Sequence, residues 1–313
     1  METVILPNTD LSVSRFAFGT ADCGTRIPTD QALRVFETYR GAGGNFIDTA
    51  HCYSAWVPEG LGVSERWVAE AVRRFGRQGL AIATKGGHCA FDGYPRPDAF
   101  LAPEVVERDL SESLERLRMD SVDLYYLHRD DPRVPVDEIV DACNRLADSG
   151  RVRHLGASNW SAERLLAANR SARSKGLRAF VILQNHWSLL QPNWSSLDAP
   201  GDVRYVLDSE RERLAEAGIP VAAWAPVRGI TELERGSSGS YDTERNRRRL
   251  EAARRVAAET GATTTQVALA YLLSQRPTAI PILGTGSETH LREALAAEGL
   301  RLTSEQLEAL ENA

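Results

Sequence analysis

The sequence predicts an α/β protein that folds as a (β/α)8 TIM barrel preceded by an N-terminal β-hairpin. Short apolar segments alternate with longer segments of helical periodicity along the chain. Strands separated by helices pair in parallel through right-handed crossovers, and eight such units close a barrel. Counting the strand that ends at Gly19, the sequence has eight units. No linker or change of composition divides the 313 residues, so we expect a single domain over 1–313.

Each element of this barrel has its own signal in the sequence. Residues 3–18 predict a hairpin that turns at Pro7 and Asn8 and leads into the first barrel strand. The other strands are predicted at 45–49, 80–85, 122–128, 154–158, 179–184, 219–225 and 279–284. Helices are predicted at 30–43, 64–76, 103–118, 136–150, 161–173, 209–218, 246–261 and 264–275. Residues that favour helix ends agree with these bounds, namely Ser64 and Pro103 at starts and Gly76, Gly150, Gly218 and Gly261 at ends.

Two glycine-rich segments need separate explanations. Residues 41–45 follow a predicted helix and precede a predicted strand, so we interpret them as the end of the helix. The phosphate-binding loop of a doubly wound fold would instead follow an early strand. Residues 226–242 are rich in Gly and Ser, and a loop of this length in a compact domain is usually functional or disordered. Because this segment follows the seventh barrel strand, we expect it to act as a flap over a ligand.

Composition narrows the class of partner. A net charge of −6 leaves no basic surface for nucleic acid, and no run of 18 apolar residues suggests a membrane span. The first residues lack the basic start and apolar stretch of a signal peptide. The four cysteines form no C-x-x-C pair, which suits reduced thiols: Cys23, Cys52, Cys89 and Cys143. We therefore expect a cytoplasmic protein that acts on a small molecule.

Four residues predict catalytic chemistry at the carboxyl ends of the strands: Asp48, Tyr53, Lys85 and His128. The phenol of Tyr53 has an ordinary pKa of about 10, which a nearby ammonium lowers and burial raises. Lys85 is the candidate ammonium, and a buried lysine needs a counter-charge such as Asp48. His128 can donate a hydrogen bond to a carbonyl oxygen. Together these groups can protonate a carbonyl oxygen while a bound cofactor delivers hydride.

Each of these four residues also has an ordinary structural explanation. Asp48 can cap a turn, Tyr53 can pack at the rim, Lys85 can extend to the surface and His128 can be a core histidine. Taken one at a time, these explanations are the more common ones. Their joint arrival at the ends of neighbouring strands favours the catalytic interpretation.

A metal site is an alternative use of the same rim. His51, Cys52, His88, Cys89 and His128 offer imidazole and thiolate ligands, which suit zinc in a metal-dependent hydrolase. However, the sequence has no H-x-H or H-E-x-x-H spacing, and two adjacent His-Cys pairs rarely direct both side chains inward. We therefore predict that no metal takes part.

Seven segments resemble, in this order, the aldo-keto reductase superfamily: 45–54, 83–87, 123–131, 150–160, 184–190, 224–229 and 280–286. The resemblance implies that Tyr53 is the proton donor, that Lys85 and Asp48 tune it, and that His128 positions the carbonyl. It also implies a nicotinamide cofactor. The residues that would hold the nicotinamide are Ser158, Asn159 and Gln184 around the carboxamide and Trp224 against the ring face.

Further positions match the family's cofactor contacts. Gly19, Thr20, Arg228 and Gly229 are four of them, and the adenosine-phosphate segment would comprise Leu283, Gly284, Thr285, Gly286, Ser287, His290 and Glu293. A glycine-rich turn before a helix also binds anions through free N–H groups and the helix dipole. Many relatives carry Lys or Arg where Gly286 stands and Asn where Ala294 stands; Arg292, His290 or Ser287 can compensate. The resemblance implies NADP(H), with NAD(H) as the alternative.

The predicted substrate pocket combines aromatic and polar side chains: Trp56, His88, Arg129, Asp130 and Trp187, with Asp22 and Asn193 nearby. Such walls suit sugars, keto-sugars or related polar carbonyls better than bulky apolar ones. The family also includes potassium-channel β subunits, so a cofactor-binding sensor is an alternative. All four catalytic residue types are present and no added docking segment is visible, which favours a reversible carbonyl reductase.

Overall fold

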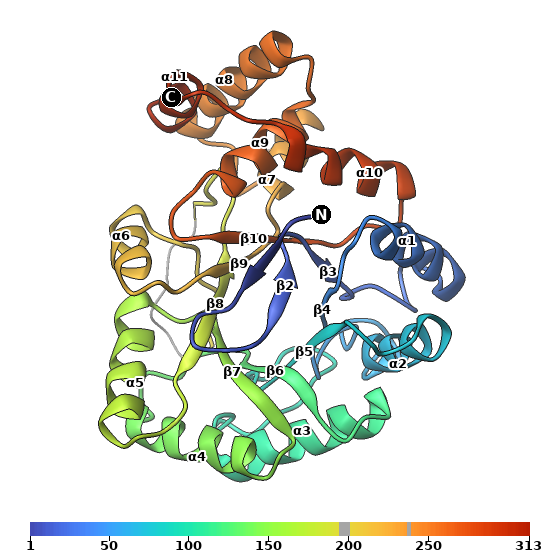
Figure 1. Ribbon diagram of the computed structural model, residues 1–313, viewed down its shortest axis with the longest axis vertical. Helices are drawn as coiled ribbons and strands as arrows, with labels where there is room; N and C mark the ends of the chain where they lie inside the picture. The colour runs from blue at the N-terminus through green and yellow to red at the C-terminus, as the bar shows by residue number, and fades with distance from the viewer. Residues whose placement is uncertain (194–200, 237–238) are drawn as a thin grey trace.

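The computed structural model describes residues 1–193, 201–236 and 239–313, and these form a closed barrel of eight parallel strands (Figure 1). The strands run around the barrel in the order β10-β3-β4-β5-β6-β7-β8-β9. Their bounds are β3 Ala17–Gly19, β4 Phe46–Asp48, β5 Ala81–Gly86, β6 Val122–Leu127, β7 Val152–Ser158, β8 Phe180–His186, β9 Val221–Trp224 and β10 Ala279–Leu283. The predicted (β/α)8 barrel is confirmed.

Helices surround the barrel because each strand leads into a crossover (Figure 1). The helices of the first half are α1 Thr29–Gly41, α2 Val63–Phe75, α3 Pro103–Leu117, α4 Val136–Asp148 and α5 Ala162–Ser174. Those of the second half are α6 Asp208–Glu216, α7 Arg228–Glu234, α8 Glu244–Thr260, α9 Thr264–Leu273, α10 Glu288–Ala296, the short 3-10 turn Ala297–Gly299 and α11 Ser304–Glu311. In the described residues no helix combines the length and apolar character needed to cross a membrane.

The N-terminal hairpin closes the amino-terminal end of the barrel. Its strands, β1 Thr3–Ile5 and β2 Ser12–Ser14, pair antiparallel, as predicted. Leu6, Leu11 and Val13 pack in one apolar cluster with Phe46 and Ala81, which begin their strands. The hairpin therefore covers this end, as Figure 1 shows, and leaves the carboxyl ends of the strands for a site.

Strand register brings the carboxyl ends of neighbouring strands to one rim. Asp48, the last residue of β4, pairs with Gly19 of β3 on one side and with Ala83 of β5 on the other. Further round, Ser158 of β7 pairs with Gln184 of β8. The predicted catalytic and cofactor residues therefore start from the same end of the barrel.

Two segments differ from the prediction. The prediction of a continuous loop over 226–242 is wrong, because α7 occupies Arg228–Glu234 and buries Ile230 in the apolar core. The helix α11 was not predicted, although Thr303 and Gln306 form a capping box at its start, a signal that the sequence carries. The remaining predicted strands and helices agree with the observed bounds to within a few residues.

Candidate active site

Lys85 joins the predicted catalytic residues into one hydrogen-bonded group. Its Nζ lies 2.7 Å from the hydroxyl of Tyr53, 2.8 Å from Oδ2 of Asp48 and 2.8 Å from the carbonyl oxygen of Thr49. All three N–H groups of the ammonium are therefore used. The phenol also donates to Oδ2 of Asp48 over 3.1 Å. The side chains of Lys85 and Asp48 are fully buried, so the pair holds a fixed geometry away from water.

The environment keeps Tyr53 protonated. Burial raises the pKa of Tyr53 well above its ordinary value, and the carboxylate of Asp48 raises it further. Burial also lowers the pKa of Lys85, while Asp48 opposes this effect. Lys85 therefore does not produce a resting tyrosinate. It instead donates a hydrogen bond to an oxygen that becomes negative only when the phenol gives up its proton.

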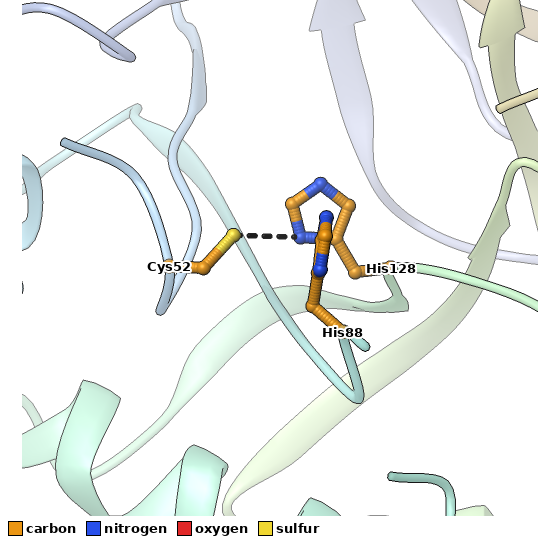
Figure 2. A group of neighbouring side chains, drawn as sticks. All are labelled: Cys52, His88 and His128. Atoms are coloured by element: carbon orange, nitrogen blue, oxygen red, sulfur yellow. Dashed lines mark hydrogen bonds between the residues drawn. The ribbon is translucent and has the colours of Figure 1, made fainter. Parts of the chain in front are cut away.

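His128 is held as a neutral imidazole. Burial lowers its pKa well below the ordinary value, and the neighbouring His88 ring and the charge of Arg129 lower it further. Sγ of Cys52 lies 3.5 Å from Nδ1 of His128 (Figure 2). Burial raises the pKa of Cys52 to about 12, so its thiol is protonated and can donate to Nδ1. With the thiol as the donor, the proton of the neutral ring lies on Nε2.

A cavity of about 940 Å³ opens beside this group, at the upper end of the range for small-molecule sites. Asp48, Tyr53, His128 and Arg129 line one part of it. Most of the predicted cofactor residues line the rest: Gly19, Ser158, Asn159, Gln184, Trp224, Arg228, Leu283, Gly284, Thr285, His290 and Glu293. The cavity is thus large enough, and polar enough, to hold a dinucleotide next to the phenol.

Four predicted cofactor residues do not line the cavity and instead support the neighbouring backbone and helices. The hydroxyl of Thr20 donates to the carbonyl oxygen of Asp48 over 3.0 Å. Gly229 allows α7 to pack, because a Cβ there would lie 2.6 Å from the ring of Tyr241. The carbonyl of Gly286 accepts a hydrogen bond from Gln31, and Ser287 caps α10.

The predicted substrate residues fall into two groups. Trp56 is 37% exposed, and its ring lies 6.1 Å from that of Tyr53, while Arg129 lines the cavity. The structure places Asp130 and Trp187 elsewhere. The carboxylate of Asp130 pairs with Arg164 over 2.9 Å, and Trp187 is buried in the apolar core.

His88 packs edge-on against His128, with ring centroids 4.7 Å apart. Cys52, His88 and His128 offer ligand atoms within 4.8 Å of one another, which is the group drawn in Figure 2. His51 does not join them, since its ring nitrogens bond Tyr94 and Glu112. The charge of Arg129, which lowers the pKa of both His88 and His128, also repels a divalent cation here. That no metal takes part stays a prediction.

Sequence reasoning named Arg228 and Gly229 in the segment after β9 but missed the other residues that this segment brings to the cavity. Val227, Thr231 and Arg235 line the cavity from α7 and its ends. Their spacing of four residues is helical and was a usable signal. Ala225, with a φ of 51°, turns the chain from β9 toward this helix. Other cavity residues that were not predicted are Ala21, Val203, Pro226, Glu232, Glu234, Thr265, Leu269, Ile282 and Ala294.

Comparison with known proteins decides the family of this barrel. The profile of the Aldo/keto reductase family matches residues 15–313. The chain belongs to this family. The protein is thus an enzyme of the aldo/keto reductase family, and its relatives are named as reductases and oxidoreductases.

Several relatives share nearly the whole chain. Norsolorinic acid reductase A of Aspergillus parasiticus is 30% identical over 97% of this chain and 77% of its own length. Aryl-alcohol dehydrogenase (NADP(+)) of Phanerodontia chrysosporium is 27% identical over 98% of this chain and 84% of its own. The crystal structure of the thermostable aldo-keto reductase Tm1743, in complex with the inhibitor epalrestat, matches with a TM-score of 0.75 at 24% identity, over 100% of this chain and 99% of that one. This last likeness shows the fold.

Proposed function

We propose that this aldo/keto reductase uses NADP(H) to reduce the carbonyl of an aldehyde or ketone reversibly to an alcohol, with Tyr53 as the general acid and base. The contact that carries the proposal is the 2.7 Å hydrogen bond from Lys85 to the hydroxyl of Tyr53 at the wall of the cavity. It links a protonated phenol to a buried cation at the wall of the cavity, where the proposed reaction needs a proton donor. A bound nicotinamide would supply the hydride, which carries both electrons of the reduction.

The protein residues supply the proton and the orientation. Nε2–H of His128 donates to the carbonyl oxygen and holds it near the phenol. As the carbonyl carbon gains hydride, its oxygen becomes negative and takes the proton from Tyr53, which forms the O–H bond of the alcohol. Lys85 stabilises the resulting phenolate, and Asp48 holds Lys85 in place. In the reverse direction the phenolate removes the same proton.

The residues proposed for the nicotinamide already form a network next to Asp48. Nε2 of Gln184 donates to Oδ1 of Asp48 over 2.8 Å, and Nδ2 of Asn159 donates to the carbonyl oxygen of His128 over 3.0 Å. The hydroxyl of Ser158 accepts from Asn159 over 3.0 Å. Positions fixed in this way would orient a carboxamide, with Trp224 beside the ring.

Preference for NADP(H) is proposed for the end of the cavity formed after β10. Thr285 and His290 line the cavity there, next to the amino-terminal end of α10. Nη2 of Arg292 lies 3.9 Å from Oε2 of Glu288 and 3.4 Å from the hydroxyl of Thr38, and Arg292 does not line the cavity. His290 is therefore our candidate for the contact to the 2′-phosphate in place of the lysine or arginine of many relatives.

The test is a fluorescence titration of the purified protein with NADPH and NADH, followed by turnover with aldoses, keto-sugars and aromatic aldehydes. We expect tighter binding of NADPH, loss of that preference in His290→Ala, and a higher kcat/KM for polar carbonyls. Equal affinity for the two cofactors would contradict the choice of NADP(H). Lack of turnover with every carbonyl, despite cofactor binding, would contradict the enzymatic proposal. We also propose a cytoplasmic location, which the four free thiols support.

A further inference from the structure

Arg129 is a cation without an ion-pair partner in the described part of the chain. It lines the cavity together with Tyr53 and His128. Its Nη1 donates one long hydrogen bond of 3.4 Å to the carbonyl oxygen of His128, and its buried Nε donates to no acceptor. A guanidinium has five N–H donors; besides this bond Arg129 contacts the thiol of Cys89, which leaves further donors for a ligand.

Two arginines near Arg129, in contrast, have carboxylate partners. Arg164 pairs with the carboxylate of Asp130 over 2.9 Å. Arg133 pairs with Asp131 over 2.7 Å and with Asp98 over 2.9 Å. The segment after β6 therefore provides carboxylates to two arginines, while among the described residues none pairs with the arginine that faces the cavity.

The charge of Arg129 is only partly compensated. Cys52, Cys89 and Tyr53 surround it, and burial raises the pKa of all three groups, which keeps them neutral. Asp202 is the acidic residue whose charge acts on Arg129, while burial lowers the pKa of the guanidinium. A buried charge without a full partner is costly, and an anionic ligand would remove that cost.

We propose that Arg129 binds an anionic group of the substrate, so that the preferred substrates are carbonyl compounds that carry a carboxylate. This inference rests on the proposed function and narrows its substrate class to oxoacids. A carboxylate can accept two parallel N–H bonds from one guanidinium. A phosphate ester also fits this fork, so the experiment below includes a phosphate arm.

The position of Arg129 separates this anion from the phosphates of a cofactor. Arg129 follows β6, whereas Gly284 and Thr285 follow β10. In the closed barrel these two strands are four places apart in a ring of eight, so they lie on opposite sides. Arg129 is instead next to His128, on the side of the proton donor. The group that it binds therefore belongs to the molecule being reduced.

The experiment compares matched pairs of substrates with the complete enzyme and its cofactor. 4-Carboxybenzaldehyde is paired with its methyl ester, and ω-oxoacids of increasing chain length are paired with theirs. Glyceraldehyde 3-phosphate with glyceraldehyde forms the phosphate arm. Each pair is measured with the native protein, Arg129→Met, Arg129→Lys and Arg133→Met. The last variant removes the same charge from the same segment, at a side chain that is half exposed.

We expect kcat/KM of the native protein to favour the acid of at least one pair about 10- to 100-fold, mainly through KM, as a charge-assisted hydrogen bond predicts. The ratio of kcat/KM for the acid to kcat/KM for its ester should fall to near one in Arg129→Met. It should stay above one in Arg129→Lys and be unchanged in Arg133→Met. A native ratio of one or less for every carboxylate pair would overturn the inference, as would a preference that survives in Arg129→Met. A preference confined to the phosphate arm would also overturn it.

Calorimetric binding of the same pairs separates this inference from the proposed function. If the native protein turns over neither member of a pair but binds the acid more tightly, and loses this difference in Arg129→Met, the anion site stands and the reductase proposal fails. If the esters are turned over as well as the acids, the reductase proposal stands and the anion site fails.

Discussion

Sγ of Cys52 lies 3.5 Å from Nδ1 of His128, within hydrogen-bonding reach of a thiol. Because the thiol keeps its proton it can donate to Nδ1, and this direction of the bond favours the tautomer that carries its proton on Nε2. We expect Cys52→Ala to lower kcat/KM about fivefold, the value of one neutral hydrogen bond. Cys52→Ser should recover most of this loss, because a hydroxyl also donates. Steady-state kinetics of both variants check the prediction, and equal losses in the two would assign only a packing role to Cys52.

Tyr53→Phe tests the proton donor directly. Removing the hydroxyl leaves the ring in place but deprives the carbonyl oxygen of its proton, so kcat should fall about 10²- to 10⁴-fold. Binding of NADPH should change little, since the lost group serves the chemical step. Single-turnover kinetics and a cofactor titration measure the two effects. Near-native turnover in this variant would remove Tyr53 from its role.

Trp224→Ala tests the aromatic contact to the nicotinamide. The ring of Trp224 lines the cavity and packs edge-on against His186, with centroids 4.8 Å apart. Loss of a stacking surface should weaken cofactor binding about 3- to 10-fold. Trp224→Phe retains an aromatic face and serves as the matched control. If both variants bind NADPH with native affinity, Trp224 does not contact the ring.

The sequence predicted the barrel well because its strands are buried on both faces. Five of the seven residues in 122–128 are apolar or aromatic, and the eight strand–helix units leave one common way to close a parallel sheet. The same logic predicted that Asp48, Lys85 and His128 meet, since residues at strand ends share one rim. The helix α7 was missed because glycine and serine around it hide a short helical spacing.

Side-chain directions beyond the strand ends were not predictable from spacing alone. Arg129 and Asp130 are adjacent, yet the first lines the cavity and the second turns outward to Arg164. Once the chain leaves a strand, the alternation of side chains no longer fixes their direction. Hydrogen-bond partners decide it instead. For this reason the sequence alone did not indicate which of the predicted substrate residues line the cavity.

The buried pair of Asp48 and Lys85 should contribute to folding as well as to catalysis. Asp48→Asn leaves the ammonium of Lys85 buried without its counter-charge, although the amide keeps the size of the side chain. Removing one partner of a buried ion pair costs about 3–5 kcal/mol of unfolding free energy. Urea unfolding measures this loss. The double variant Asp48→Asn with Lys85→Met should recover part of it, and a further additive loss would contradict the pairing.

His186 should make the stability of the fold depend on pH. Burial lowers its pKa to about 3, while its Nε2 lies 2.7 Å from the hydroxyl of Tyr241. The unfolded chain binds a proton at this residue below pH of about 6.5, whereas the folded protein resists it down to the lowered pKa. The unfolding free energy should therefore fall as the pH drops through this window, by about 1.4 kcal/mol per pH unit for this residue.

The variant His186→Gln isolates that contribution. Glutamine does not titrate and can still bond the hydroxyl of Tyr241. Urea unfolding between pH 7 and pH 5 should show that the unfolding free energy of the variant falls less steeply with falling pH. The two slopes should differ by up to about 1.4 kcal/mol per pH unit, which corresponds to the uptake of one proton. The native slope also contains His128, whose pKa is lowered as well, so it should remain positive in the variant. Identical slopes in the native protein and in His186→Gln would show that His186 takes up its proton in the folded state.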